Sequence, residues 1–263
     1  MLKPLHRFDM KRLLAALAVV ASGVLLCSCA ASNEKTVAVV GKTKISQATL
    51  NHWMTVTLGG DYRSAVGKTA PDGLVSDPVD YPRCISTAAR ILAQSGKGKQ
   101  SDGQLRQKCR QLNAGIKEQA LSYVLSVLWA IEEGKEIGSR VSEGEVTRRV
   151  RELANRDRYH GPLQFTRYLA QLRRSIGDER FLVKRNILEN RFVERITKQA
   201  GHADDREEAE KAKVRLILKN NAKWTAKTDC SPGYLAWECK QYGSSKAVSP
   251  APAVVIEELA SGA

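Results

Sequence analysis

The longest regular pattern in the sequence is an amphipathic stretch over residues 102–137. Apolar residues recur there at the spacing of one helical face, at Leu121, Val124, Leu125, Leu128 and Trp129. This spacing predicts a long α-helix that buries one stripe against other helices. Similar patterns predict shorter helices beginning after Ser46, over 86–94, after Ser142, after Pro162, over 179–199 and over 206–220. The chain is therefore predicted to be mainly α-helical.

Short strands are predicted only near the N-terminus. Apolar residues over 37–40 and 43–45 flank Gly41 and Lys42, a pattern typical of a tight β-hairpin with glycine in the turn. Residues 59–83 are rich in Gly, Asp, Pro and Ser and are predicted to form a loop insertion. The segment 243–263 has Ser, Ala and Pro without periodicity, and it is predicted to be a disordered tail.

The first 28 residues have the composition of a bacterial export signal. Four basic residues precede an apolar run over 13–26, which is shorter than the roughly twenty residues that a membrane-spanning helix needs. The run ends in Leu26-Cys27-Ser28-Cys29, which resembles a lipobox. The small Ser28 before Cys29 favours Cys29 as the lipidated residue, followed by a tether over 29–35. Ordinary secretion with cleavage nearby and retention as a membrane helix are the alternatives.

Charge and export together restrict the partners. Removing residues 1–28 takes away four basic residues and one acidic residue, so the formal charge falls from +14 to +11. A surface this basic favours anionic partners. For an exported chain these are lipid head groups, anionic envelope polymers or acidic unfolded polypeptides, and not nucleic acid. A solvated basic surface without a specific partner is the alternative.

Four further cysteines fit an oxidising compartment. Cys84, Cys109, Cys230 and Cys239 allow three disulfide pairings, and proximity in the sequence favours Cys84–Cys109 and Cys230–Cys239. A zinc site is the competing interpretation. No two of these cysteines have Cys-x-x-Cys spacing, and none lies beside a histidine, so disulfides are favoured over metal binding.

No catalytic motif is recognisable. The histidines at 52, 160 and 202 are scattered, whereas catalysis needs a nucleophile, a base and an orienting group close together. The sequence contains neither His-Glu-x-x-His nor Gly-x-Ser-x-Gly. The basic stretches lie on predicted helices without the aromatic or groove-reading elements of nucleic-acid binders. We therefore predict no catalytic residues, metal or cofactor.

Several short segments resemble the SurA/PrsA-type foldases in the order in which they occur. Residues 37–46 read Val-Ala-Val-Val-Gly-Lys-Thr-Lys-Ile-Ser, similar to the hairpin that opens the chaperone module of that family. Val40 stands where the family frequently has Asn. Further similarities extend the match over about residues 36–240, at Leu50, Trp53, Cys109, Leu112, 119–121, Leu128, Trp129, Glu132, 137–138, 141–146, 165–169, 224–230, Tyr234 and Cys239.

The resemblance implies a SurA N-terminal-like chaperone module over 36–199, followed by a helix and disulfide element over 200–242. Many relatives carry a parvulin peptidyl-prolyl isomerase domain between the long helix and the C-terminal element. Here only 25 residues separate Thr197 from Lys223, too few for that domain. The family function without the isomerase is the binding of unfolded, newly exported polypeptides.

The prediction is therefore a non-enzymatic chaperone, anchored by its lipid to the outer face of the cytoplasmic membrane. Trp53, Met54, Leu125 and Trp129 are its candidate residues, either in a peptide-binding groove or in the core. Two alternatives stay open. One is an envelope scaffold or wall-polymer-binding lipoprotein, and the other is a prolyl isomerase with an unrecognised site.

Overall fold

The computed structural model describes residues 34–75, 80–94, 96, 100–156, 159, 161–200, 206–242 and 252–261. The chain divides into two units, Met1–Lys35 and Thr36–Ala263, and every helix and strand named below belongs to the second. The predicted export signal and the predicted lipid attachment at Cys29 lie outside the described residues.

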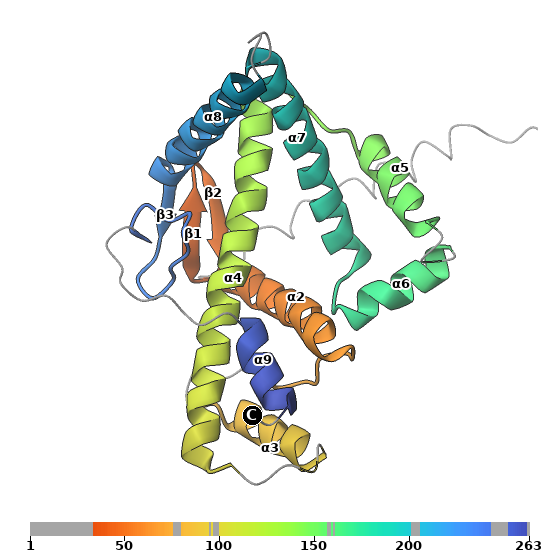
Figure 1. Ribbon diagram of the computed structural model, residues 1–263, viewed down its shortest axis with the longest axis vertical. Coiled ribbons are helices and arrows are strands. Elements are labelled where there is room, and N and C mark those ends of the chain that lie inside the picture. Colours follow the sequence, from red (N-terminus) through yellow and green to blue (C-terminus); the bar gives the residue numbers. More distant parts are fainter. Residues whose placement is uncertain are drawn as a thin grey trace, which may run out of the picture. The chain divides into compact units, whose positions relative to one another are not determined.

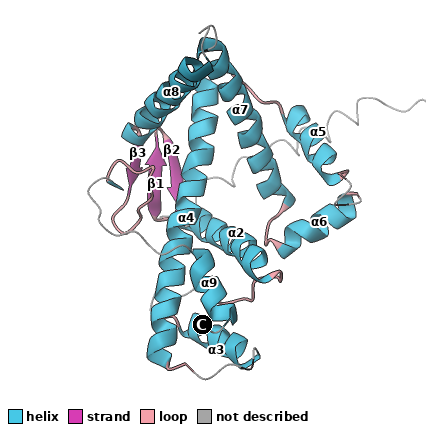
Figure 2. Ribbon diagram, in the orientation of Figure 1, coloured by secondary structure: helices cyan, strands magenta, loops and turns pink. Residues whose placement is uncertain are grey.

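Within the described ranges the chain forms three short strands and eight helices (Figures 1 and 2). The strands are β1 (Thr36–Val40), β2 (Thr43–Ser46) and β3 (Thr228–Cys230). The helices are α2 (Gln47–Val66), α3 (Pro82–Gln94), α4 (Asp102–Glu136), α5 (Glu143–Ala154), α6 (Pro162–Gln171), α7 (Ile176–Ala200), α8 (Arg206–Ala226) and α9 (Pro252–Ser261). The predicted fold class, mainly helical with a small sheet, is confirmed.

The sheet joins the start of the described domain to a segment that follows α8. Its order is β2-β1-β3, and both pairings are antiparallel. Gly41 forms the turn between β1 and β2 with a φ of 58°, a left-handed conformation that glycine adopts readily. The predicted hairpin is therefore confirmed. The third strand was not predicted, because Thr228–Cys230 is too short to show an alternating pattern.

Helix α4 packs against α2, α3, α7 and α9. Ser101 and Gln104 form a capping box at its N-terminus, which satisfies backbone N–H groups that have no partner inside the helix. The predicted stripe is largely buried, and Leu121 and Leu125 are fully inaccessible. The apolar spacing of residues 102–137 thus correctly indicated both a helix and its buried face.

Both disulfides have the pairing that sequence proximity favours. Cys84 and Cys109 link α3 to α4 with an S–S distance of 2.02 Å, and Cys230 and Cys239 close a short loop with an S–S distance of 2.00 Å. Across the described part of the chain, no three His, Cys, Asp or Glu side chains are grouped so that they could hold a metal ion. The cysteines therefore serve as cross-links.

A second, smaller buried cluster lies between α5, α6 and α7. Phe165 of α6 meets the ring of Tyr159 edge-on at a centroid distance of 4.9 Å. Ser142 caps α5 by accepting a hydrogen bond from the backbone N–H of Glu145, as the Ser-x-x-Glu pattern indicates.

The predicted loop over 59–83 is wrong for its first part, because α2 continues through Gly59 and Gly60 to Val66. Gly59 faces the turn between α6 and α7, where a Cβ atom would lie 2.4 Å from the carbonyl oxygen of Leu172. Glycine is thus required at position 59, because α2 and the turn after α6 approach each other too closely for a Cβ atom. Residues 82–83 are also helical, as the start of α3.

The predicted disordered tail over 243–263 is wrong for Pro252–Ser261, which forms α9. Pro252 occupies the first helical position, where a missing N–H costs nothing. Val255, Ile256 and Leu259 are buried against the rest of the domain. This apolar stripe is barely one turn long. It is too short to be recognised as a periodic pattern among the surrounding Ser, Ala and Pro residues.

Candidate functional site

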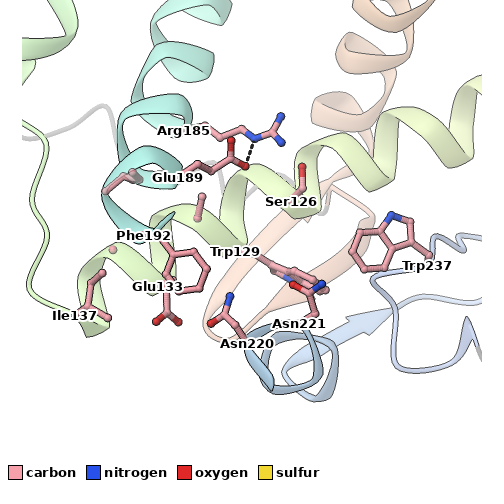
Figure 3. Close-up of a pocket in the computed structure, with 13 residues that line it drawn as sticks. Ser126, Trp129, Glu133, Ile137, Arg185, Glu189, Phe192, Asn220, Asn221 and Trp237 are labelled. Carbon is pink, nitrogen blue, oxygen red and sulfur yellow. Dashed lines mark hydrogen bonds and ion pairs between the residues drawn. The ribbon is translucent and has the colours of Figure 1, made fainter. Parts of the chain in front are cut away.

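A groove runs between α4, α7 and α8, and we call it the α4–α7–α8 groove (Figure 3). It consists of two adjoining hollows of about 250 and 220 Å³. The two hollows share Glu133, Ile137, Phe192 and Asn220. Its apolar lining also includes Trp129, Leu188, Ile196, Leu216 and Trp237.

Helix periodicity places the lining residues on facing surfaces. On α4 and just after it, Trp129, Glu133 and Ile137 follow one another at intervals of four residues, so they share one face. Leu188 and Phe192 do the same on α7. Gly134 allows the two helices to approach, because a Cβ atom there would lie 2.6 Å from Cδ2 of Leu188.

Two tryptophans form one wall of the groove. The ring of Trp129 meets that of Trp237 edge-on at 5.5 Å. Trp129 is held in place because its indole N–H donates to the hydroxyl of Thr228 at 2.8 Å. Trp129 is only 6% exposed, whereas Trp237 is 49% exposed. Trp237 therefore offers accessible aromatic surface to the groove.

Several charged side chains of the groove are held in ion pairs. Arg185 pairs with Glu189 at 2.7 Å on α7. Lys223 pairs with Glu133 and, at 2.6 Å, with Glu136. Partial burial opposes the charge on Lys223, but the hydrogen bonds to both carboxylates outweigh it and raise the pKa of Lys223. These charges stabilise the walls and border the apolar floor.

One carboxylate of these ion pairs, that of Glu133, lies buried between α4 and α8. Glu133 accepts a hydrogen bond from the indole N–H of Trp224 at 2.9 Å, in addition to that from Lys223. The ammonium groups of Lys223 and Lys227 lie 4.9 and 4.7 Å from the Trp224 ring centroid, within the range of cation–π attraction. This set of contacts fixes the C-terminal part of α8 on α4.

Next to Trp237 in the sequence is a fully buried carboxyl group, that of Glu238. One oxygen accepts a hydrogen bond from the hydroxyl of Ser122 at 2.6 Å, and the other has no partner among the described residues. Burial, together with the charge of Glu118, raises the pKa of Glu238 to about 7 against the opposing hydrogen bond from Ser122. The hydrogen bond from Ser122 thus joins the loop that carries Trp237 and Glu238 to α4.

Of the four candidate residues, only Trp129 lines the groove. Trp53, Met54 and Leu125 are buried in the main core, where the ring of Trp53 contacts those of Tyr123 and Phe181 at 5.2 and 5.6 Å. The core interpretation is therefore the correct one for these three.

Sequence reasoning missed two of the groove's aromatic residues, Phe192 and Trp237. Phe192 belongs to the apolar stripe of residues 179–199, but that stripe does not distinguish a core position from one lining a groove. Trp237 lies in the loop closed by the disulfide Cys230–Cys239, whose cysteines are nine positions apart. This loop has no periodic pattern of apolar residues from which a structure could be predicted.

His52, Asp178 and Ser175 are brought together at the start of α7. The imidazole Nε2 of His52 lies 2.7 Å from one oxygen of Asp178, and the hydroxyl of Ser175 donates to the other at 2.7 Å. The carboxylate lies between the two, which is not the order in which a histidine would activate a serine. Burial alone would raise the pKa of Asp178, but the hydrogen bonds from Ser175 and His52 lower it. The cluster therefore ties α2 to α7, and the histidines at 160 and 202 lie outside the described residues.

Among the helices that the structure describes, none combines the length and the apolar character needed to cross a bilayer. Comparisons of the chain with protein-family models, with curated proteins and with solved structures found no match. The resemblance to the SurA/PrsA-type foldases therefore stays a prediction.

Proposed function

We propose that this protein is an extracytoplasmic chaperone that holds apolar segments of unfolded, newly exported polypeptides in the α4–α7–α8 groove. The observation that carries the proposal is the groove itself, with an apolar floor between three helices and a half-exposed tryptophan at its wall. Such a surface binds many sequences loosely, because any unfolded chain offers apolar side chains. The paired charges around the floor suit binding without bond-making chemistry.

Three features of the sequence support the same proposal. The export signal and Cys29 would place the protein, anchored by lipid, at the outer face of the cytoplasmic membrane. The formal charge of +11 after removal of residues 1–28 would attract acidic segments of clients. The order of the short segments over 36–240 resembles that of the SurA/PrsA-type foldases.

The proposal predicts that Trp237→Ala weakens client binding about tenfold, because the side chain supplies accessible aromatic surface to the groove. Binding can be measured by fluorescence anisotropy with a labelled, reduced and carboxymethylated client protein. The matched control is Leu163→Ala on α6, which removes a 64% exposed apolar side chain that does not line the groove. This control variant should bind the client as the unmodified protein does.

Light scattering by an aggregating client tests the function as a whole. The purified exported protein should slow the aggregation of a reduced client, and Trp237→Ala should slow it less. An envelope scaffold would leave the scattering unchanged. Equal losses in the Trp237 and Leu163 variants would show that the groove is not the binding site. Acceleration of a proline-limited refolding reaction would instead support the isomerase alternative.

A further inference from the structure

Helix α9 packs against α2, α3 and α4 (Figure 1), and we call the surface that these three helices present to it the α2–α3–α4 groove. Val255, Ile256 and Leu259 of α9 are buried there, whereas Val254 is 51% exposed. The buried residues stand at positions i, i+1 and i+4, so they form one stripe on the helix. This is how an amphipathic helix binds in an apolar groove.

The walls of this α2–α3–α4 groove are held together independently of α9. The disulfide Cys84–Cys109 joins α3 to α4, and α2 packs directly against α4. Near the end of α9, Glu258 lies 3.5 Å from Lys108 of α4. The groove therefore combines an apolar floor with a basic residue that meets an acid on the bound helix.

Helix α9 is short, and packing against α2, α3 and α4 holds it in place. The helix has ten residues, fewer than the roughly 12–15 that make an isolated helix even marginally stable in water. Its helical form therefore depends on the groove. Nine residues, 243–251, join it to the remainder of the domain, and all four cysteines that form disulfides precede it. Departure of α9 would therefore leave both disulfides intact.

We propose that the α2–α3–α4 groove is a second polypeptide-binding site, and that α9 is an intramolecular ligand that other chains must displace. The expected partner is an amphipathic helical segment with two adjacent apolar residues, a third apolar residue three or four positions further on, and an acid beside it. A covalent tether keeps α9 at a high effective concentration. Only segments that bind more tightly, or that are locally abundant, would therefore displace it. This proposal uses a different surface from the α4–α7–α8 groove, and either can fail alone.

The test uses a fluorescent peptide with the sequence of Pro252–Ser261 and three full-length proteins. Ile256→Asp puts a charge into the buried stripe and should release the chain's own α9. Val254→Asp is the matched control, because it puts the same charge on the exposed face of the same helix. The peptide should bind the Ile256→Asp protein at least about tenfold more tightly than either the unmodified or the Val254→Asp protein, because its groove is vacant. Equal binding by all three would overturn the proposal.

Two further outcomes are decisive. If Ile256→Asp removes the far-ultraviolet circular dichroism of the whole domain, α9 is a structural part of the core and the proposal fails. The same holds if this variant keeps its fold but does not bind the peptide. In the unmodified protein, the amides of α9 should exchange with deuterium about a hundredfold faster than those of α4, because α9 opens locally. Equal protection of the two helices would also contradict the proposal.

Discussion

Replacing Gly59 by alanine is expected to lower the free energy of unfolding by about 3 kcal/mol, at the upper end of overpacking effects. The added Cβ atom would lie 2.4 Å from the carbonyl oxygen of Leu172 and 2.7 Å from its carbonyl carbon. These are backbone atoms and cannot rotate away. The next residue, Arg173, has a φ of 54°, and it donates to the carbonyl of Ala70 at 2.6 Å. The turn is thus held on both sides and has little freedom to move.

Thermal unfolding checks this prediction, and the melting temperature should fall by roughly 6–12 °C for a domain of this size. Gly60→Ala is the control, since a Cβ atom there would have no neighbour within 4 Å. In the middle of α2 this alanine should raise the free energy of unfolding by about 0.5–1 kcal/mol. The two variants should therefore shift stability in opposite directions. Similar shifts would mean that α2 does not approach Leu172 in solution.

The contribution of Glu238 to the stability of the protein is expected to fall as pH rises from about 4.5 to 7. Its pKa is raised from 4.5 to about 7 in the folded protein, so the folded state binds the proton more tightly than the unfolded state does. The stabilisation from this proton is complete below the unfolded pKa of 4.5 and is lost as pH rises through the folded pKa of about 7. A shift of this size corresponds to about 3 kcal/mol at most.

Glu238→Gln should remove this dependence, because the amide stays neutral and its oxygen can still accept the hydrogen bond from Ser122. At pH 8 the variant should be more stable than the unmodified protein, by up to about 3 kcal/mol. At pH 4.5 the two should be nearly equal. Urea denaturation at both pH values measures the difference, and Glu194→Gln, an exposed acid on α7, is the control with an expected effect within about 0.5 kcal/mol. Equal urea denaturation curves for the Glu238 variant and the unmodified protein at pH 8 would contradict a raised pKa of Glu238 in the folded protein.

The helices could be predicted because their evidence is local. The stripe of residues 102–137 and the Ser142–Glu145 cap each specify structure within one or two turns. Glycines were harder to interpret, because the same residue type ends a helix or permits a close contact. Gly59 permits a contact, and the contacting residue, Leu172, is more than a hundred positions away. Local composition therefore favoured a loop where the structure continues a helix.

The groove could be predicted only in part. Trp129 and Phe192 each lie on a predicted apolar stripe, but a stripe does not show whether its helix is covered completely. That depends on how α8 meets α4 and α7, which is determined by contacts such as that between Glu133 and Trp224. Trp237 and Glu238 lie in a disulfide loop whose position is set by tertiary contacts such as the Ser122 hydrogen bond. Such long-range contacts cannot be predicted from the spacing of neighbouring residues in the sequence.

The order of strands in the small sheet constrains how the protein can be made. Strand β1 near the N-terminus pairs with β3 close to the end of the domain, and Ser231 donates to the carbonyl of Thr36 across 195 positions. A chain that emerges N-terminus first presents β1 long before its partner strand has been synthesised. Until then the edge of β1 is exposed and can pair with other chains. Completion of this sheet is therefore a late step in folding, and a nascent copy of the protein would itself need protection from aggregation.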